Sequence, residues 1–423
     1  MGKGFLRFTA IVATLLLSSS MFLTGCASSK LSLVKPPEST ASGDTAGNTA
    51  ETDPADTANT AAPETVEAEN TANDPGASDI PEVKPPADDI KVKALYLTGW
   101  TVSSTKKLEH FVELAKNTEL NSYVVDIKDD DGYVGYESQV PEVREVGGWM
   151  KKYDADKVLK AFHENGIHVI GRIVCFKDTI LSSKKPELAI KDKRGGLYKT
   201  KNTDGKMITW LNPYEKGSWS YLIAIAREAV NKGFDEIQFD YIRFANDGPK
   251  QYMDFTAYTE PRDKAINDFL DYARKELPGV VLSADVFGII CESPGDTENI
   301  GQNLESIGKN INYISPMAYP SHYANGQIVN KVTFPKPDLD PYNVVYNTLV
   351  KAKDRISKVG DYNAGVRPYI QDFTASWLKK GYYQTYGPEQ VKQQIKAVYD
   401  AGYEQWILWD AMNTYDEAGL LKE

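Results

Sequence analysis

Residues 233–244, GFDEIQFDYIRF, place a carboxylate where it could do chemistry. Apolar and polar residues alternate along this stretch, which predicts a β-strand with Asp240 and Gln238 on the face opposite the apolar residues. In a barrel of parallel strands, Asp240 would point toward the axis at the C-terminal rim, where such folds carry their chemistry. A buried carboxylate is costly unless it is used or paired, so Asp240 is either functional or the partner of nearby Arg243.

The elements that position this carboxylate begin after Lys91, where short apolar segments alternate with amphipathic ones. The predicted strands are 92–100, 122–128, 169–176, 236–241, 280–287, 313–319, 366–372 and 405–410, and the predicted helices are 107–118, 155–165, 218–231, 263–276, 342–357 and 388–400. This alternation predicts an α/β fold, a (β/α)8 TIM barrel over residues 91–423. An open doubly wound sheet is the alternative, although Thr98-Gly99-Trp100 is not its usual glycine-rich phosphate turn.

Acidic side chains end several of these strands, without a histidine, cysteine or metal-binding set beside them. Paired carboxylates suit the hydrolysis of glycosidic bonds, in which one carboxyl donates a proton and the other attacks or activates water. Asp240 and Asp285 end adjacent strands and form the expected catalytic pair, with their two roles left open. Asp126 and Asp410 are reserves, and Glu292 could replace Asp285 as the acid.

Aromatic and polar side chains at the same strand ends could bind a carbohydrate polymer or oligosaccharide. Aromatic rings pack against the apolar faces of sugar rings, and amide or guanidinium groups bond to hydroxyls. The expected substrate contacts are Asp126, Arg172, Tyr241, Arg243, Tyr319, Gln371, Trp409, Asp410 and Asn413. No metal-site spacing occurs, so we expect neither metal nor cofactor. We expect Cys175 and Cys291 to be small core or near-core residues, and a disulfide between them in an exported protein is the alternative.

The first 26 residues predict an exported protein. Lys3 and Arg7 precede an apolar run, residues 11–23, which is too short for a permanent membrane span and is typical of a secretory signal. The run ends in Leu23-Thr24-Gly25-Cys26, which resembles the bacterial lipobox. That resemblance implies removal of residues 1–25 and a lipid anchor on Cys26 at the outer face of a bacterial cell membrane.

Residues 26–90 form a predicted disordered linker. The stretch 27–90 has no aromatic residue and carries 13 acidic and 3 basic residues, so it cannot bury enough apolar surface to fold. Most of the formal net charge of −11 therefore belongs to the linker. The nearly neutral remainder offers no basic footprint for nucleic acid.

Several segments resemble bacterial (β/α)8 barrels catalogued as a glycoside hydrolase domain of unknown function. They are LNSYVVDIKDDDG, KKPELAIKDKRGG, ITWLNP, GFDEIQFDYIRF, YISPMAYP, VRPYIQDF and AGYEQWILWDAMNTY, and they sample nearly all of residues 91–423. The resemblance implies an enzyme that hydrolyses O-glycosyl bonds outside the membrane, with Asp240 as its leading catalytic carboxylate.

The stretch GFDEIQFDYI is also similar to the strand-four motif of family 18 chitinases, GFDGxDxDxE. Asp235 and Asp240 match the first and third acidic positions, but Gln238 occupies the second and Ile242 the position of the catalytic glutamate. The substrate-assisted chitinase mechanism needs that glutamate and does not carry over. The departure leaves open a non-catalytic protein that binds carbohydrate or cell wall.

A lyase or aldolase that uses Lys128 or Lys177 as a Schiff-base amine is a further alternative. Such a lysine must lose its proton, and both lie beside an aspartate in the sequence, Asp129 or Asp178. A neighbouring carboxylate favours the charged amine, which counts against this chemistry.

Overall fold

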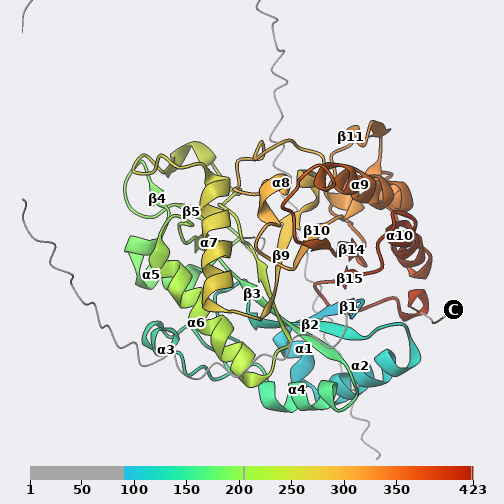
Figure 1. Ribbon diagram of the computed structural model, residues 1–423, viewed down its shortest axis with the longest axis horizontal. Helices are drawn as coiled ribbons and strands as arrows, with labels where there is room; N and C mark the ends of the chain where they lie inside the picture. Colours follow the sequence, from blue (N-terminus) through green and yellow to red (C-terminus); the bar gives the residue numbers. More distant parts are fainter. Residues whose placement is uncertain (1–89, 203–204, 421, 423) are drawn as a thin grey trace, which may run out of the picture. The chain divides into compact units, whose positions relative to one another are not determined.

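The computed structural model describes residues 90–202, 205–420 and 422. The predicted signal segment, Cys26 and the linker up to residue 89 lie outside the described residues. The described chain forms a closed barrel of parallel strands (Figure 1). Its strands, in order around the barrel, are β1 (Lys93–Leu97), β2 (Ser122–Lys128), β3 (His168–Val174), β7 (Glu236–Asp240), β9 (Val281–Phe287), β10 (Tyr313–Met317), β13 (Gly365–Val366) with β14 (Tyr369–Gln371), and β15 (Trp406–Trp409).

Pairing of β15 with β1 and of β9 with β10 closes the sheet. The (β/α)8 prediction is confirmed in its barrel, and the open doubly wound alternative is wrong. Each predicted strand is found within a few residues of its expected bounds. The seventh strand is divided because Arg367 and Pro368 interrupt the ladder between β13 and β14.

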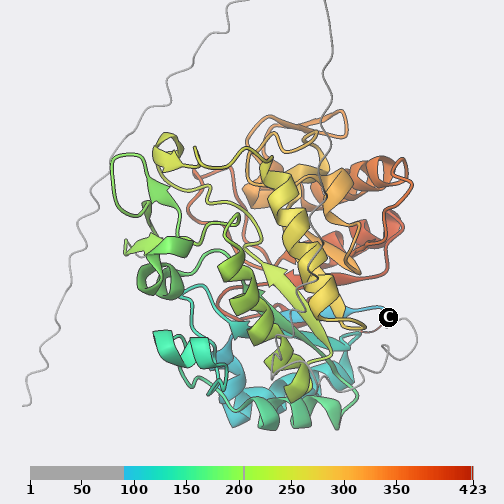
Figure 2. The same cartoon turned by 60° about the vertical axis from the view of Figure 1, so that its left-hand side comes forward.

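Helices surround the barrel (Figure 1). The connecting helices are α2 (Thr105–Asn117), α4 (Ala155–His163), α6 (Lys216–Lys232), α7 (Arg262–Glu276), α8 (Leu304–Ile307), α9 (Pro341–Ile356) and α10 (Pro388–Asp400). All six predicted helices are present, and α6 and α7 lie side by side outside β7 (Figure 2). The helical connection after β9 is reduced to the single turn α8, and within the described residues no α-helix follows β15.

Shorter elements decorate the loops. They are α1 (Gly99–Ser103), α3 (Pro141–Val146), α5 (Thr179–Lys184), and the antiparallel pairs β4 (Lys191–Asp192) with β8 (Met253–Asp254), β5 (Lys199–Lys201) with β6 (Met207–Thr209), and β11 (Gln327–Val329) with β12 (Val332–Phe334). None of the helices in the described part of the chain is long and apolar enough to cross a bilayer.

Local sequence signals explain where the main helices begin and end. The Ser104 and Asp154 side chains accept hydrogen bonds from the first turns of α2 and α4, and Pro388 begins α10. Gly233 ends α6 with φ of 107°, a left-handed conformation that costs glycine little. That stop turns the chain directly into β7, the strand that carries Asp240.

The barrel interior is partly apolar, with Ala94, Val124, Ile170 and Ile407 in one buried cluster, but its side formed by β7 and β9 is polar. At its base, Glu236 forms a buried ion pair with Arg367 and accepts a hydrogen bond from Ser283. One step toward the rim, Gln238 Oε1 accepts a 2.6 Å hydrogen bond from the Tyr369 hydroxyl. The polar face of β7 is therefore a row of three inward-facing side chains, Glu236, Gln238 and Asp240, from the base of the barrel to its rim.

The apolar residues on the outer face of the strands pack against the surrounding helices. Ile237 and Phe239 of β7 belong to this outer core, together with buried residues of α6 and α7. Cys175 and Cys291 are free and buried, as predicted for small core residues.

Candidate active site

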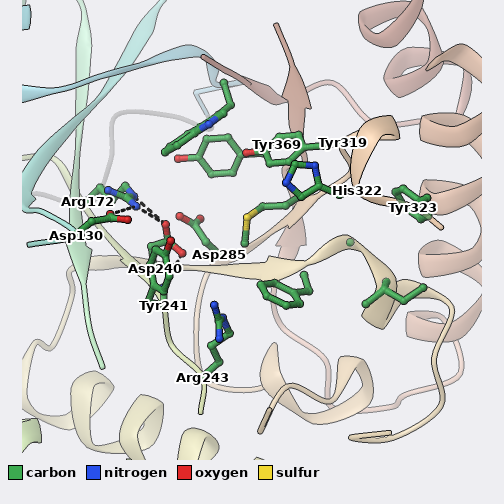
Figure 3. Close-up of a pocket in the computed structure, with 15 residues that line it drawn as sticks. Asp130, Arg172, Asp240, Tyr241, Arg243, Asp285, Tyr319, His322, Tyr323 and Tyr369 are labelled. Carbon is green, nitrogen blue, oxygen red and sulfur yellow. Dashed lines mark hydrogen bonds and ion pairs between the residues drawn. The ribbon is translucent and has the colours of Figure 1, made fainter. Parts of the chain in front are cut away.

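A cavity of about 420 Å³ lies at the C-terminal rim of the barrel (Figure 3). Its walls come from the ends of β3, β7, β9, β10, β14 and β15, from the loops that follow them and from the loop after β2. The lining residues are Asp130, Arg172, Asp240, Tyr241, Arg243, Asp285, Phe287, Gly288, Ile289, Met317, Tyr319, His322, Tyr323, Tyr369 and Trp409. We call this the central cavity.

A second cavity of about 280 Å³ adjoins it and shares Asp130 and Trp409 with it. Asp126, Tyr133 and the exposed ring of Trp100 contribute to its walls. We call it the side cavity. Because the two cavities have residues in common, they offer room for more than one sugar ring.

Asp240 is held by a buried arginine on the neighbouring strand. Its Oδ2 accepts hydrogen bonds from Arg172 Nε at 2.9 Å and Nη2 at 2.6 Å, and its Oδ1 accepts one from the Tyr241 amide at 2.5 Å (Figure 3). Charge-assisted hydrogen bonds from an arginine stabilise the ionised carboxylate. Asp240 is thus a fixed anion in the wall of the central cavity.

The backbone is strained immediately after this carboxylate. Tyr241 has φ of 48°, a left-handed conformation that is uncommon for a bulky residue and costs about 1 kcal/mol or more. This turn breaks the strand alternation, which predicted Tyr241 on the same face as Phe239. Tyr241 instead lines the central cavity, where its amide also bonds to Asp240.

Arg172 also holds two carboxylates besides Asp240. Its Nη1 donates to Asp126 at 2.7 Å and its Nη2 to Asp130 at 3.2 Å. Burial alone would lower the pKa of Arg172, but the surrounding carboxylates raise it well above its ordinary value. Burial would raise the pKa of Asp130, yet Arg172 and Lys177 lower it to about 2. The guanidinium therefore organises three carboxyl groups at one edge of the cavity.

Asp285 has the opposite environment. Its side chain is 1% exposed, and neither carboxyl oxygen has a hydrogen-bond partner among the described residues. Burial, reinforced by the charge of Asp240, raises the pKa of Asp285 well above its ordinary value. In the β7–β9 register Phe239 pairs with Ala284, so Asp285 follows beside Asp240 on the same face. The pair combines a hydrogen-bonded carboxylate with a buried neighbour whose pKa is raised.

Tyr319 and Trp409, two further expected substrate contacts, line the central cavity. The Trp409 ring stacks on Tyr96 with centroids 4.0 Å apart. Arg243 also lines the cavity, and it does not form the proposed ion pair with Asp240, because Arg172 occupies that carboxylate. The structural explanation considered for Arg243 is therefore wrong.

Three of the expected substrate contacts form hydrogen bonds within the protein instead. Gln371 is fully buried, and its side chain bonds to Ser321 and Asp338. Asp410 caps the turn that follows β15, and Asn413 bonds to the backbone of Tyr96. None of the three lines either cavity, so each is placed as part of the scaffold.

The reserve acids are also placed outside the central cavity. Asp126 lines the side cavity and accepts from the Tyr96 hydroxyl at 2.7 Å. Glu292 accepts from the Asn330 amide at 2.9 Å and lines neither cavity. Asp285 thus remains the acid that faces Asp240.

The lysines of the Schiff-base alternative are paired. Lys128 is fully buried, 2.9 Å from Asp178, and also donates to the Val174 carbonyl. Lys177 donates to Asp130 at 2.9 Å. Neither lysine lines a cavity, so the site does not favour amine chemistry.

Sequence reasoning missed Asp130, Phe287, His322 and Tyr369 as cavity residues. Asp130 and Phe287 stand at or just after strand ends, a position that could have singled them out. Partial desolvation of the ring in the cavity wall lowers the pKa of His322, although the residue as a whole is exposed. Within the described ranges, no group of three or more His, Cys, Asp or Glu side chains could hold a metal ion.

A closed parallel barrel with two unlike carboxylates in a rim cavity defines a glycosidase-like (β/α)8 protein. The family model described as "Putative glycosyl hydrolase domain" matches residues 94–415, and the chain belongs to that family. No curated protein matches the chain in sequence.

The chain is similar to several solved structures. The glycoside hydrolase domain of PgaB (BpsB) from Bordetella bronchiseptica is 12% identical, with a TM-score of 0.55 over 79% of this chain and 100% of that one, and it shares the fold. A hypothetical protein from Ruminiclostridium thermocellum ATCC 27405 is 64% identical over 45% of this chain and 97% of that one, with a TM-score of 0.42. The α-galactosidase TtGalA from Thermus thermophilus is 12% identical over 79% and 66%, with a TM-score of 0.49.

Proposed function

We propose that this protein hydrolyses glycosidic bonds in a polysaccharide or glycan, with Asp285 as general acid and Asp240 as nucleophile or base. The observation that carries the proposal is the contrast between the two neighbouring carboxyls. Asp240 receives three hydrogen bonds, whereas Asp285 is buried without a partner among the described residues and its pKa is raised. Environments that separate the pKa values of two carboxyls supply the acid and the base of such a reaction.

The proposed reaction uses only these two side chains and water. Asp285 gives its proton to the glycosidic oxygen as the bond to the anomeric carbon breaks, and Asp240 attacks that carbon or activates the water that does. If Asp240 attacks, water then cleaves the ester between Asp240 and the sugar, with deprotonated Asp285 accepting the proton of that water. Arg172 keeps Asp240 ionised and oriented through its two hydrogen bonds. The position of the chitinase glutamate holds Ile242, which is fully buried, so no substrate-assisted step is proposed.

The aromatic residues around the cavities support a polymeric substrate. Tyr319 lies 5.7 Å, between ring centroids, from Phe373, which in turn stacks at 5.7 Å on Trp377. Trp377 is 64% exposed, so this series of rings leads from the central cavity to the surface. Exposed aromatic faces suit successive sugar rings.

We further propose that the chain acts outside the cell, tethered by a lipid on Cys26 through residues 26–90. The lipobox-like tetrad at residues 23–26 and the aromatic-free linker support this location. Replacing Cys26 with serine should release the protein from the membrane fraction without altering its activity.

Activity of the full chain on bacterial and plant polysaccharides tests the reaction, with reducing ends as the readout. Asp240→Asn and Asp285→Asn should each lower kcat by about 10²–10⁴-fold, the usual contribution of a positioned acid or base. Hydrolysis that survives both substitutions would reject the assignment. Binding of a glycan without product, by the unmodified chain, would favour the non-catalytic alternative.

A further inference from the structure

Arg243 is a buried cation without a counterion among the described residues. It is 6% exposed and lines the central cavity, on the other side of Asp240 from Arg172 (Figure 3). Its Nη1 donates to the Phe244 carbonyl at 3.0 Å. Its Nε and Nη2 make no hydrogen bond, and no carboxylate forms an ion pair with it, within residues 90–202, 205–420 and 422.

The other two cations at this rim already form ion pairs with carboxylates. Arg172 is bonded to Asp126, Asp130 and Asp240, and Lys177 is bonded to Asp130. Arg243 is the exception among the three. It is therefore the cation in the cavity wall that can bind a further group.

Three aromatic rings hold the guanidinium in place. Its central carbon lies 5.0 Å from the ring centroid of Trp210, 5.1 Å from that of Tyr241 and 4.6 Å from that of Phe287. Ring faces attract a cation but accept none of its in-plane N–H bonds in the way an oxygen does. The rings thus fix the orientation of the guanidinium and leave two of its nitrogens unused.

Burial of this charge is unfavourable until an anion joins it. Burial lowers the pKa of Arg243, although arginine keeps its proton under ordinary conditions. A guanidinium edge matches the paired oxygens of a carboxylate or a sulfate, and such a bidentate contact is among the stronger hydrogen-bonding arrangements in proteins. The acids whose charges act on Arg243 do not fill this role, since Asp240 is bonded to Arg172, Asp130 is bonded to Lys177, and Asp247 forms no ion pair with Arg243 among the described residues.

We propose that the sugar bound in the central cavity carries an anionic substituent, a carboxylate or a sulfate ester, which Arg243 receives. This inference rests on the proposed function in placing a glycan in the cavity. It deepens that function by naming the substrate class as an acidic glycan.

Matched pairs of polymers test the inference on the Asp285→Asn chain, in which the amide mimics the protonated acid and cleavage is blocked. One pair is polygalacturonate and its carboxyl-reduced form, and the other is a sulfated galactan and its desulfated form. Affinity electrophoresis measures binding. We expect at least one acidic polymer to bind about tenfold or more tightly than its neutral counterpart, the gain of one charge-assisted contact.

Arg243→Gln, added to that chain, should abolish this preference, and Arg243→Lys should retain part of it. Arg262→Gln is the matched control, because Arg262 also stacks on two phenylalanines and donates to a backbone carbonyl but lies outside both cavities. It should leave the preference unchanged.

Equal or weaker binding of the acidic member in both pairs would overturn the inference, as would a preference that persists in Arg243→Gln. The comparison of acidic with neutral polymers on the Asp285→Asn chain uses native Arg243, so a folding defect of an Arg243 variant does not affect that comparison. If the chain prefers the acidic polymers but the unmodified chain hydrolyses no glycan, the proposed reaction is wrong and the inference about acidic glycans stands. If the chain hydrolyses only neutral glycans, the inference about acidic glycans is wrong and the proposed reaction stands.

Discussion

At the scale of single residues, the site shows how one side-chain type acquires two properties. Asp240 and Asp285 have the same carboxyl group on neighbouring strands, but Arg172 contacts only the first. Burial of the second without a partner raises its pKa. The arginine on β3 therefore distinguishes the two carboxyl groups, and its loss should affect both stability and activity.

Replacement of Arg172 with methionine should destabilise the fold by about 3–5 kcal/mol near pH 8, because three carboxylates lose their buried cation. The loss should be smaller at pH 5, since unpaired carboxyls take up protons more readily and are then no longer charged. Urea unfolding at both pH values measures the difference. Arg227→Met, which breaks a partly exposed pair with Glu276, is the control and should cost about 1 kcal/mol or less. An equal loss for Arg172→Met at both pH values would contradict the account.

At the scale of elements, strand register sets the distance between the two carboxyls that we propose as catalytic. Asp240 and Asp285 follow the paired residues Phe239 and Ala284 on β7 and β9. Neighbouring strands are about 4.8 Å apart, and both side chains point into the barrel. This spacing resembles the about 5–5.5 Å between the carboxyls of retaining glycosidases more than the wider gap of inverting ones.

We therefore expect hydrolysis with retention of the anomeric configuration. Proton NMR of the first product, recorded before mutarotation, distinguishes the two outcomes. A product with inverted configuration would show that a water molecule fits between the acid and the base. In that case a more distant carboxylate than Asp240 would have to act.

The segment after β14 and the C-terminal tail form a second pH-sensitive element. Burial raises the pKa of Asp372 to about 7, while its Oδ2 accepts a 2.9 Å hydrogen bond from the Asp416 amide. The folded state thus binds this proton more tightly than the unfolded chain, where the pKa is about 3.9. The contribution to stability is complete below about pH 4 and is lost as the pH rises to about 7.

Asp372→Asn should remove this loss, since the amide stays neutral and its oxygen can still accept from Asp416. Between pH 5 and pH 8, the unfolding free energy of the wild type should fall relative to that of the variant, by a few kcal/mol at most. Denaturant titrations across that range measure the difference. Parallel pH profiles for the two chains would exclude Asp372 as the titrating group.

The strands were predictable because their apolar, β-branched and aromatic runs are dense, and strand adjacency also brought Asp240 and Asp285 together. The partner of Asp240 was not predictable, since Arg172 lies 68 residues away and nearby Arg243 competed for the assignment. The orientation of Tyr241 depends on one left-handed backbone angle, which strand alternation cannot express. Asn413 has a side-chain amide that could bind a substrate hydroxyl, but in the fold this amide donates a hydrogen bond to the carbonyl of Tyr96.

At the scale of the whole folded unit, residues 90–420, the two cavities and the aromatic series form a surface longer than one sugar. Trp409 lines both cavities, and Trp377 ends the aromatic series at the surface. A polymer that lies across these rings gains contacts that a short oligosaccharide does not reach. Binding of long substrates should therefore depend on residues far from the carboxyls.

Trp377→Ala should raise KM for a polymeric substrate about two- to tenfold, the worth of one aromatic contact, and leave kcat nearly unchanged. The KM for a short chromogenic glycoside should not change. Ile328→Ala, which removes another exposed apolar side chain on β11 away from both cavities, is the control. An equal effect of Trp377→Ala on both substrates would place the ring within the central cavity instead.

The contact between β15 and β1 has a consequence for how the chain is made. β1 pairs with β15, and Asn413 then bonds to the carbonyl of Tyr96, 317 residues earlier. While the ribosome is still producing the intervening segments, one edge of β1 has no partner and exposes its amides and carbonyls. Nascent chains that stop before residue 406 therefore cannot complete the ring, and they are the species that chaperones and proteases would encounter.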